Sequence, residues 1–292
     1  MFIATLIAAT LSKGEVADAR DRLDAAGCLP VAHRWVEEGE AADLQFGRDP
    51  DAARGALEEV FPGVDVVVQP AAHRRKKLIV ADMDSTMITV ECIDELADYA
   101  GIKPQIAAIT ERAMRGELDF GAALDERVAL LKGMDAGVID RCLAERVRIT
   151  PGAKALVRTM KAHGATAILV SGGFTRFAEP VAAEIGFDRA IANRLEIADG
   201  RLAGTVARPI VDSATKEATL AAAVLEQGLE RGETMAVGDG ANDLPMIAVA
   251  GLGIAYRAKP VVAAAAGARI DHGDLSALLF AQGYARREWA SG

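Results

Sequence analysis

A short apolar run that stops at two carboxylates constrains this chain more than any other feature of its sequence. Leu78 to Ala81 reads Leu-Ile-Val-Ala, and Asp82 and Asp84 follow directly. An unbroken apolar run with β-branched members, followed by turn-forming polar residues, is typical of a buried strand in a parallel sheet. Open α/β sheets bind ligands at the carboxyl ends of such strands. Two carboxylates this close repel each other, which favours a divalent cation between them, although an Asx-type turn would also explain the spacing.

Two later strand ends carry matching chemistry. The run Ala165 to Val170 ends in Ser171-Gly172-Gly173, which supplies a hydroxyl and unhindered backbone N–H groups for an anion in front of a helix. The run Glu233 to Val237 ends in Gly238-Asp239-Gly240-Ala241-Asn242-Asp243, a loop with two further carboxylates. Lys216 lies between them, near the start of an Ala-rich helical stretch. The order D-x-D-x-T, S-G-G, K and G-D-x-x-N-D predicts an α/β fold with a Rossmann-like parallel sheet.

This combination resembles the haloacid dehalogenase-like (HAD) phosphatases, and it is far more specific than any of its parts. The stretch between the first two motifs is similar to the phosphoserine phosphatase family. Thr89–Asp98 reads Thr-Val-Glu-Cys-Ile-Asp-Glu-Leu-Ala-Asp, and Thr110–Lys132 contains Thr-Glu-Arg-Ala-Met-Arg-Gly-Glu-Leu-Asp-Phe and Arg-Val-Ala-Leu-Leu-Lys. The resemblance runs from about Leu78 to about Gly273. It implies Mg²⁺-dependent hydrolysis of O-phospho-L-serine to L-serine and phosphate through an aspartyl phosphate, the last step of serine biosynthesis.

The resemblance also implies a role for each motif residue. Asp82 is expected to be the nucleophile, and Asp84 the general acid and base. The Mg²⁺ ligands are expected to be Asp82, Asp239 and the backbone carbonyl of Asp84, with Asp243 orienting the ion and its waters from behind. The expected substrate-binding residues are Ser171, Gly172 and Lys216 on the phosphoryl group, Asn242 beside it, Glu91 and Arg127 on the amino and carboxylate groups, and Phe120 on the pocket wall.

The segment after the first strand predicts a helical cap. From Thr89 to about Arg148 the apolar residues recur at helical spacing. Helices inserted at this point would cover the ligand-binding edge and shield an aspartyl phosphate from water. We therefore expect a phosphatase domain over 74–292, with its core at 74–88 and 150–292 and its cap at 89–149. Further along, the Asp199-Gly200 dipeptide predicts a hairpin.

Residues 1–73 predict a separate small domain with the order βαββαβ, which is a ferredoxin-like unit. We expect strands over Phe2–Ala9, Leu29–Val36, Ala42–Phe46 and Val64–Val68, and helices over Gly14–Ala26 and Asp49–Phe61. Such a unit resembles the ACT-type domains that sense amino acids. It is either a sensor or a spacer and dimerisation element, and the sequence favours neither. The oligomeric state is not determined by the sequence, and a homodimer is one option.

Composition limits the other functions. A net charge of −9 argues against a nucleic-acid-binding protein, and no apolar run approaches the ~18 residues of a membrane span. Three cysteines without C-x-x-C spacing predict a reducing, cytoplasmic setting without a disulfide framework. The apolar stretch Phe2–Leu11 has no basic residues before it, so a signal peptide is not expected. We interpret the basic cluster His73–Lys77 as a solvated linker in preference to a polyanion-binding patch.

Two other functions stay open at this point. The first is the same chemistry on another small phosphate monoester, or phosphoryl transfer to an acceptor other than water. Only Glu91 and Arg127 argue against it, and as residues alone both would be ordinary charges on a helix surface. The second is an amino-acid-sensing regulatory protein without activity, which the intact set of catalytic residue types makes improbable.

Overall fold

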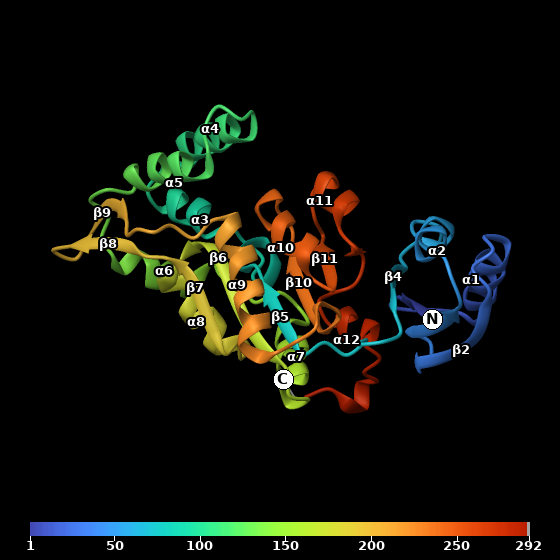
Figure 1. The fold of residues 1–292 in the computed structure, drawn as a ribbon. Helices are drawn as coiled ribbons and strands as arrows, with labels where there is room; N and C mark the ends of the chain where they lie inside the picture. Colours follow the sequence, from blue (N-terminus) through green and yellow to red (C-terminus); the bar gives the residue numbers. More distant parts are fainter. Residues whose placement is uncertain (291–292) are drawn as a thin grey trace.

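The computed structural model describes residues 1–290, which form a small N-terminal unit, a central α/β core and a helical insertion (Figure 1). The N-terminal unit has the predicted βαββαβ order, with an antiparallel sheet in the strand order β2-β3-β1-β4. Its elements are β1 Phe2–Ile7, α1 Lys13–Ala25, β2 Pro30–Glu37, β3 Ala41–Phe46, α2 Pro50–Leu57 and β4 Asp65–Pro70.

The two faces of the N-terminal sheet are buried against different partners. Because side chains alternate across a strand, Leu6 of β1 packs with α1 and α2, whereas Ile7 belongs to the hydrophobic cluster that includes Leu278 of the core helix α12 (Ala277–Ala281). Asp65, at the start of β4, accepts hydrogen bonds from three successive backbone N–H groups at 271–273. The N-terminal unit is therefore packed on the core and not merely tethered to it.

The segment that joins the two parts corrects one sequence-based interpretation. Arg74 and Lys76 are only 8% and 4% exposed, so reading His73–Lys77 as a solvated linker is wrong for these two residues. Arg74 donates to both carboxylate oxygens of Asp43, at 2.5 and 2.6 Å. The Lys76 ammonium donates to two backbone carbonyls, at 2.9 Å each. Both basic side chains form hydrogen bonds at the junction between the N-terminal unit and the core.

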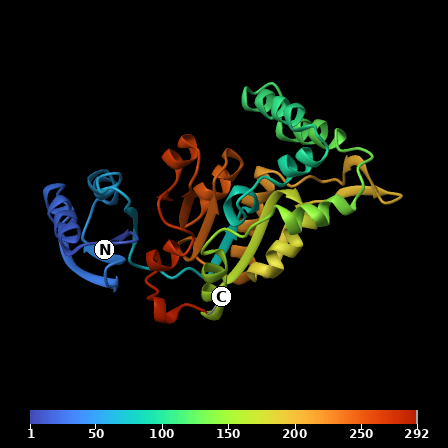
Figure 2. The same cartoon turned by 180° about the vertical axis from the view of Figure 1, so that it is seen from behind.

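The core is a parallel sheet with the strand order β12-β11-β10-β5-β6-β7, which confirms the predicted Rossmann-like architecture (Figure 2). Its strands are β5 Leu78–Ala81, β6 Thr166–Phe174, β7 Arg189–Asn193, β10 Thr234–Gly238, β11 Leu252–Tyr256 and β12 Ala268–Ile270. One face packs on α7 Ala153–Ala162, α8 Thr175–Ile185 and α12, and the other on α9 Ser213–Gln227, α10 Leu244–Val249 and α11 Pro260–Ala265. All side chains of β5 are buried because both faces are covered.

Four short helical segments lie between these elements or near the end of the chain: η1 Met83–Met87, η2 Arg231–Glu233, η3 Ala241–Asp243 and η4 Arg286–Glu288.

The predicted helical cap is present directly after β5. Its helices are α3 Cys92–Tyr99, α4 Lys103–Met114, α5 Phe120–Ala129 and α6 Gly137–Glu145. The chain leaves and returns to the core through adjacent backbone, because Ile88 pairs with Ile149 and the Thr89 N–H donates to the Arg148 carbonyl at 3.0 Å. No helix described within residues 1–290 combines the length and the apolar character that a membrane crossing requires.

A hairpin from the core is attached to the cap. The Asp199-Gly200 dipeptide forms its turn, with φ values of 50° and 74°, as the sequence predicted. Leu202 exchanges backbone hydrogen bonds with the cap: its carbonyl accepts from Gly133 at 2.8 Å, and its N–H donates to Met134 at 2.9 Å. The hairpin strands are β8 Leu195–Ala198 and β9 Arg201–Val206.

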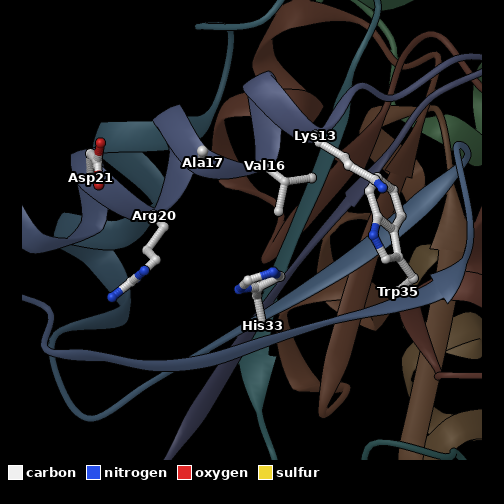
Figure 3. A pocket seen from close by; sticks show the side chains of 7 residues that line it. All are labelled: Lys13, Val16, Ala17, Arg20, Asp21, His33 and Trp35. Carbon is white, nitrogen blue, oxygen red and sulfur yellow. The ribbon is translucent and has the colours of Figure 1, made fainter.

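A cavity of about 360 Å³ lies on the outer side of the N-terminal unit, between α1 and β2 (Figure 3). It is lined by Lys13, Val16, Ala17, Arg20, Asp21, His33 and Trp35. His33 and Trp35 are two residues apart on β2, so both project from the face of the strand that looks toward α1.

Candidate active site

The sequence motifs converge on a pocket of about 620 Å³ at the carboxyl ends of β5, β6 and β10, beneath the cap. This is the edge at which parallel α/β sheets bind ligands. The predicted site residues that line it are Asp82, Asp84, Glu91, Phe120, Arg127, Ser171, Gly172, Asp239 and Asn242. The two remaining predicted residues, Lys216 and Asp243, are fully buried against Asp82.

Lys216 joins two of the acidic motifs. Its ammonium lies 2.7 Å from Asp82 Oδ1 and 2.6 Å from Asp243 Oδ1. The helix that carries it, α9, begins at Asp212, whose carboxylate accepts the Thr215 N–H at 2.9 Å. Burial alone would lower the Lys216 pKa, but the charges of Asp82 and Asp243 raise it above its ordinary value. The ammonium therefore stays charged and holds the two carboxylates together.

Three carboxylates far apart in the sequence meet here. Asp82, Asp239 and Asp243 each offer an oxygen, and these atoms lie within 4.8 Å of one another. Both oxygens of Asp243 are occupied, Oδ1 by Lys216 and Oδ2 by the N–H groups of Asp239 and Gly240. Within residues 1–290, Oδ2 of Asp82 accepts no hydrogen bond, since Lys216 and the Met83 N–H both contact Oδ1. Asp82 and Asp239 thus have oxygens available, whereas Asp243 holds the loop in place.

The cluster carries more negative charge than one ammonium can balance. Burial raises the Asp82 pKa well above its usual range, and the charge of Asp243 adds to the effect. Burial also raises the Asp239 pKa to about 6, against the hydrogen bond that Thr86 Oγ1 donates at 2.8 Å. An all-oxygen donor set with excess negative charge fits a hard divalent cation such as Mg²⁺.

The carboxylate of Asp84 has a separate environment from the cluster. Its Oδ1 accepts the Cys92 N–H at 3.0 Å, and its Oδ2 lies 3.5 Å from the Ser171 hydroxyl. Burial raises the Asp84 pKa to about 7, and the charge of Glu91 contributes in the same direction. A carboxyl group with a pKa near neutrality is suited to give and take a proton within one cycle.

Close approach of neighbouring groups explains the two glycines after Ser171. A Cβ at Gly172 would lie 2.9 Å from the ring of Phe120, and a Cβ at Gly173 would lie 2.7 Å from Asp84 Oδ2. The Gly173 N–H donates to Ser171 Oγ at 2.9 Å. Glycine at both positions therefore lets the cap and the acidic loop come close to the same piece of backbone.

The cap brings two charged side chains over the acidic edge. Glu91 precedes α3, and its Oε1 accepts a hydrogen bond from the Ser85 hydroxyl at 2.6 Å. Arg127 lies on α5, where its Nε donates to the Ala123 carbonyl at 3.1 Å. In the part of the chain that the structure describes, its other guanidinium nitrogens have no hydrogen-bond partner, so they are available to a ligand.

Comparison with known proteins identifies the family. The family model for haloacid dehalogenase-like hydrolases matches residues 79–248, more than half of the chain. A phosphoserine phosphatase of Streptomyces coelicolor is 47% identical over 285 residues, which cover 91% of this chain and 69% of that protein. The chain belongs to the phosphoserine phosphatase family. Phosphoserine phosphatase SerB2 of Mycobacterium tuberculosis is also 47% identical, over 77% of this chain and 55% of its own length.

A solved structure extends this phosphoserine phosphatase likeness to the N-terminal unit. The crystal structure of a probable phosphoserine phosphatase from Vibrio cholerae, in unliganded form, has a TM-score of 0.78 and 30% sequence identity to this chain. The match covers 98% of this chain and 88% of that one. The arrangement of a small α/β unit ahead of a capped HAD core is therefore shared.

Sequence reasoning missed several residues of this phosphoserine phosphatase pocket. Thr86 belongs to the D-x-D-x-T motif, so its position two residues after Asp84 was a usable signal for its contact with Asp239. Ser85 has a left-handed backbone, with φ of 55°, which turns its hydroxyl toward Glu91. Lys259 also lines the pocket, but it follows β11 outside every motif. Other lining residues not predicted include Ile93, Asp94, Thr110, Leu118, Ala123 and Leu124.

Proposed function

We propose that this chain hydrolyses O-phospho-L-serine to L-serine and phosphate, with Asp82 as the nucleophile. The observation that carries the proposal is the position of Asp82. Its carboxylate, whose Oδ2 accepts no hydrogen bond within residues 1–290, belongs to a cluster of carboxylates at the sheet edge, beneath a cap that supplies Glu91 and Arg127. The names of its relatives agree with this substrate.

The metal ligands in this proposal are the side chains of Asp82 and Asp239 and the backbone carbonyl of Asp84. Bound Mg²⁺ would offset the repulsion between the attacking carboxylate and the phosphate dianion. Asp243 supports this arrangement from behind, because its own oxygens are taken up by Lys216 and two backbone N–H groups. The excess negative charge of the cluster is the structural support for a cation here.

The reaction proceeds by two displacements at phosphorus. Asp82 attacks in line and forms an aspartyl phosphate, while the bond from phosphorus to the serine oxygen breaks and Asp84 donates a proton to that oxygen. Asp84 then accepts a proton from the water that attacks the aspartyl phosphate, which releases phosphate and restores Asp82. The Asp84 pKa of about 7 supports this double role.

Three groups would hold the transferred phosphoryl group. These are the hydroxyl of Ser171, the backbone N–H of Gly172 and the ammonium of Lys216, with Asn242 beside them on the pocket wall. Donors that are already in place when charge develops lower the barrier more than donors that must reorganise. Lys216 meets this condition because Asp82 and Asp243 hold its ammonium in position.

Glu91 and Arg127 would select an amino-acid substrate. Arg127 can bind a carboxylate through two parallel hydrogen bonds, and Glu91 can accept from the substrate ammonium group. Phe120 lines the same pocket, and its ring lies against Gly172. The cap thus recognises the serine part of the substrate, and the core recognises the phosphate.

The division of the chain follows from the same proposal. We place an ACT-like unit at 1–73 and the phosphatase at 74–292, with its core at 74–88 and 150–292 and its cap at 89–149. Pairing of Ile88 with Ile149 supports these cap limits. Amino-acid sensing by the N-terminal unit and association into a homodimer both stay predictions.

The test is phosphate release from O-phospho-L-serine before and after removal of metal. Dialysis against a chelator should abolish turnover, and added Mg²⁺ should restore it. A panel of other phosphate monoesters, assayed in parallel, measures the preference for the serine ester. Turnover that persists at full rate after chelation would contradict the metal assignment, and a faster rate on an unrelated ester would contradict the substrate.

A further inference from the structure

A cavity of about 370 Å³ lies where the N-terminal unit, the joining segment and the C-terminal segment meet. Four arginines from these three segments line it: Arg34, Arg74, Arg75 and Arg287. Glu288 is the one carboxylate that lines it within the described residues. The chain as a whole has a net charge of −9, whereas the charged side chains that line this cavity are mostly positive. We call it the junction cavity.

Arg74 lines the bottom of the junction cavity, and its charge is balanced by Asp43. Its side chain is 9% exposed, and it binds both oxygens of Asp43, whose own side chain is fully buried. It also donates to the carbonyls of Phe280 and Ala281 and to the hydroxyl of Thr5. These bonds balance the charges of Arg74 and Asp43 against each other and fix the position of Arg74.

Arg34 brings an unbalanced positive charge to the cavity from β2. Figure 3 shows His33 and Trp35 on the side of β2 that faces α1, so Arg34 projects from the opposite side. Its Nε donates to Asp43 at 3.0 Å, which anchors the planar group. Its two terminal nitrogens have no hydrogen-bond partner in residues 1–290, and its side chain is 60% exposed.

Arg75 and Arg287 supply the other wall. The guanidinium of Arg75 stacks over the ring of Tyr284 at 4.1 Å and donates to Glu288 at 2.7 Å, which balances that carboxylate. Arg287 is exposed and makes no hydrogen bond or ion pair within the described chain. With Asp43 and Glu288 each balanced by one arginine, the charges of Arg34 and Arg287 remain in excess.

We propose that the junction cavity binds a small phosphate-bearing anion. Guanidinium groups can donate two parallel hydrogen bonds to phosphate oxygens. Arg34 and Arg75 are already held in position by other contacts, so they lose less conformational entropy on binding than free side chains would. The volume is in the range of small-molecule sites. The ligand bridges the N-terminal unit and the C-terminal segment, so its binding fastens the N-terminal unit to the core. This site is separate from the proposed catalytic pocket and does not depend on the proposed function.

Isothermal titration calorimetry of the full chain in chelator, without divalent cations, tests the proposal. Inorganic phosphate and pyrophosphate are the two probes, each compared with sodium chloride at equal ionic strength. We expect saturable binding of at least one probe that persists in Ser171→Ala. The tighter of the two identifies the source, either free phosphate or a compound with linked phosphates. The double variant Arg34→Gln/Arg287→Gln should weaken that binding at least tenfold. Absence of saturation with both probes overturns the proposal.

Control variants separate this site from the catalytic pocket and from general charge effects. Arg189→Gln removes an arginine on β7, at the far edge of the core sheet, and should leave the affinity unchanged. Ser171→Ala should weaken anion binding in the catalytic pocket and leave the junction cavity intact. Loss of binding in Ser171→Ala, together with retention in the double variant, would place the anion in the catalytic pocket and overturn the proposal. The single variant Arg287→Gln removes no internal contact, so it tests the site without a risk to folding.

Discussion

The domain junction and the catalytic pocket both bury charged side chains, but they balance charge differently. At the junction, Arg74 binds both oxygens of Asp43, and Asp65 accepts three backbone N–H groups. In the pocket, a single ammonium is shared by Asp82 and Asp243 while further carboxylates lie close by. The buried groups Arg74, Asp43 and Asp65 find their partners within the chain, whereas the buried carboxylates of the pocket are in excess. The difference separates groups that hold the fold from groups that bind and react.

Two buried lysines show the same difference. Burial lowers the Lys76 pKa to about 8, because the only partners of its ammonium in the described chain are backbone carbonyls. Lys216 is also buried, but its two carboxylate neighbours raise its pKa above the ordinary value. A raised or lowered lysine pKa therefore depends on the partner supplied and not on burial alone.

The largest effect is expected from Asp82→Asn. Turnover of O-phospho-L-serine should fall at least about 10⁴-fold because the amide is not a nucleophile. The melting temperature should stay the same or rise, since one of several crowded negative charges is removed. Phosphate release and thermal unfolding, measured on the same preparation, check both parts. Asp51→Asn, at an exposed position in α2, is the matched control, and comparable turnover in the two variants would exclude Asp82 as the nucleophile.

The next effect is expected at the junction. Arg74→Met should lower the free energy of unfolding by up to about 3–5 kcal/mol, because it removes the buried partner of Asp43 and leaves only the largely exposed Arg34 to balance that carboxylate. Urea unfolding measures the loss. The double variant Arg74→Met/Asp43→Asn should recover part of it, since the buried negative charge that Arg74 balanced is gone. A single variant as stable as the original protein would show that this pair is not needed at the junction.

A pH effect should follow from Lys76. Its folded pKa of about 8 lies below the unfolded value of 10.5, so between these pH values the unfolded chain binds more protons. Stability should therefore rise with pH across this window, by about 3 kcal/mol at most, and the contribution should be constant below pH 8. Urea unfolding at several pH values, compared with Lys76→Met, isolates the slope. Identical slopes in the two proteins would mean that Lys76 is not the group responsible.

The smallest effect concerns the substrate end of the pocket. Arg127→Ala should lower kcat/KM for O-phospho-L-serine about 10- to 100-fold, the cost of one charge-assisted interaction with a carboxylate. A generic aryl phosphate has no such carboxylate, so its kcat/KM should change by less than about threefold. Steady-state assays on both esters give the comparison. If both substrates lose the same factor, Arg127 acts on the fold or the phosphate and not on the serine carboxylate.

The catalytic edge could be predicted because its signals are local. Each motif follows a strand of one parallel sheet, and strand ends of such a sheet meet in space, so Asp82, Ser171 and Asp239 were placed together correctly. Glu91 and Arg127 were found only through resemblance, since a charged residue on a helix is most often exposed. Lys259 gave no local signal because it enters the pocket from the end of a different strand, β11.

The contacts at the domain junction could not be predicted, because the partners of its basic residues are distant in the sequence. Arg74 and Lys76 lie in a run of basic residues, which on local grounds predicts an exposed segment. The carbonyls and carboxylate that bury them come from Asp43, Ala281 and Gly232, the last two about 150 to 210 residues further along the chain. The packing of α12 on the free face of the N-terminal sheet creates this environment. The residues next to Arg74 and Lys76 in the sequence give no indication of it.

The hydrogen bonds between the β8–β9 hairpin and the cap have a mechanical consequence. The insertion and the hairpin form one body that is fastened to the sheet at two separate places, through Ile88 and Ile149 and through the ends of the hairpin. A movement of the cap away from the sheet would therefore carry the hairpin with it and would have to bend the backbone at both attachments, which restricts the directions in which Arg127 could leave the acidic edge.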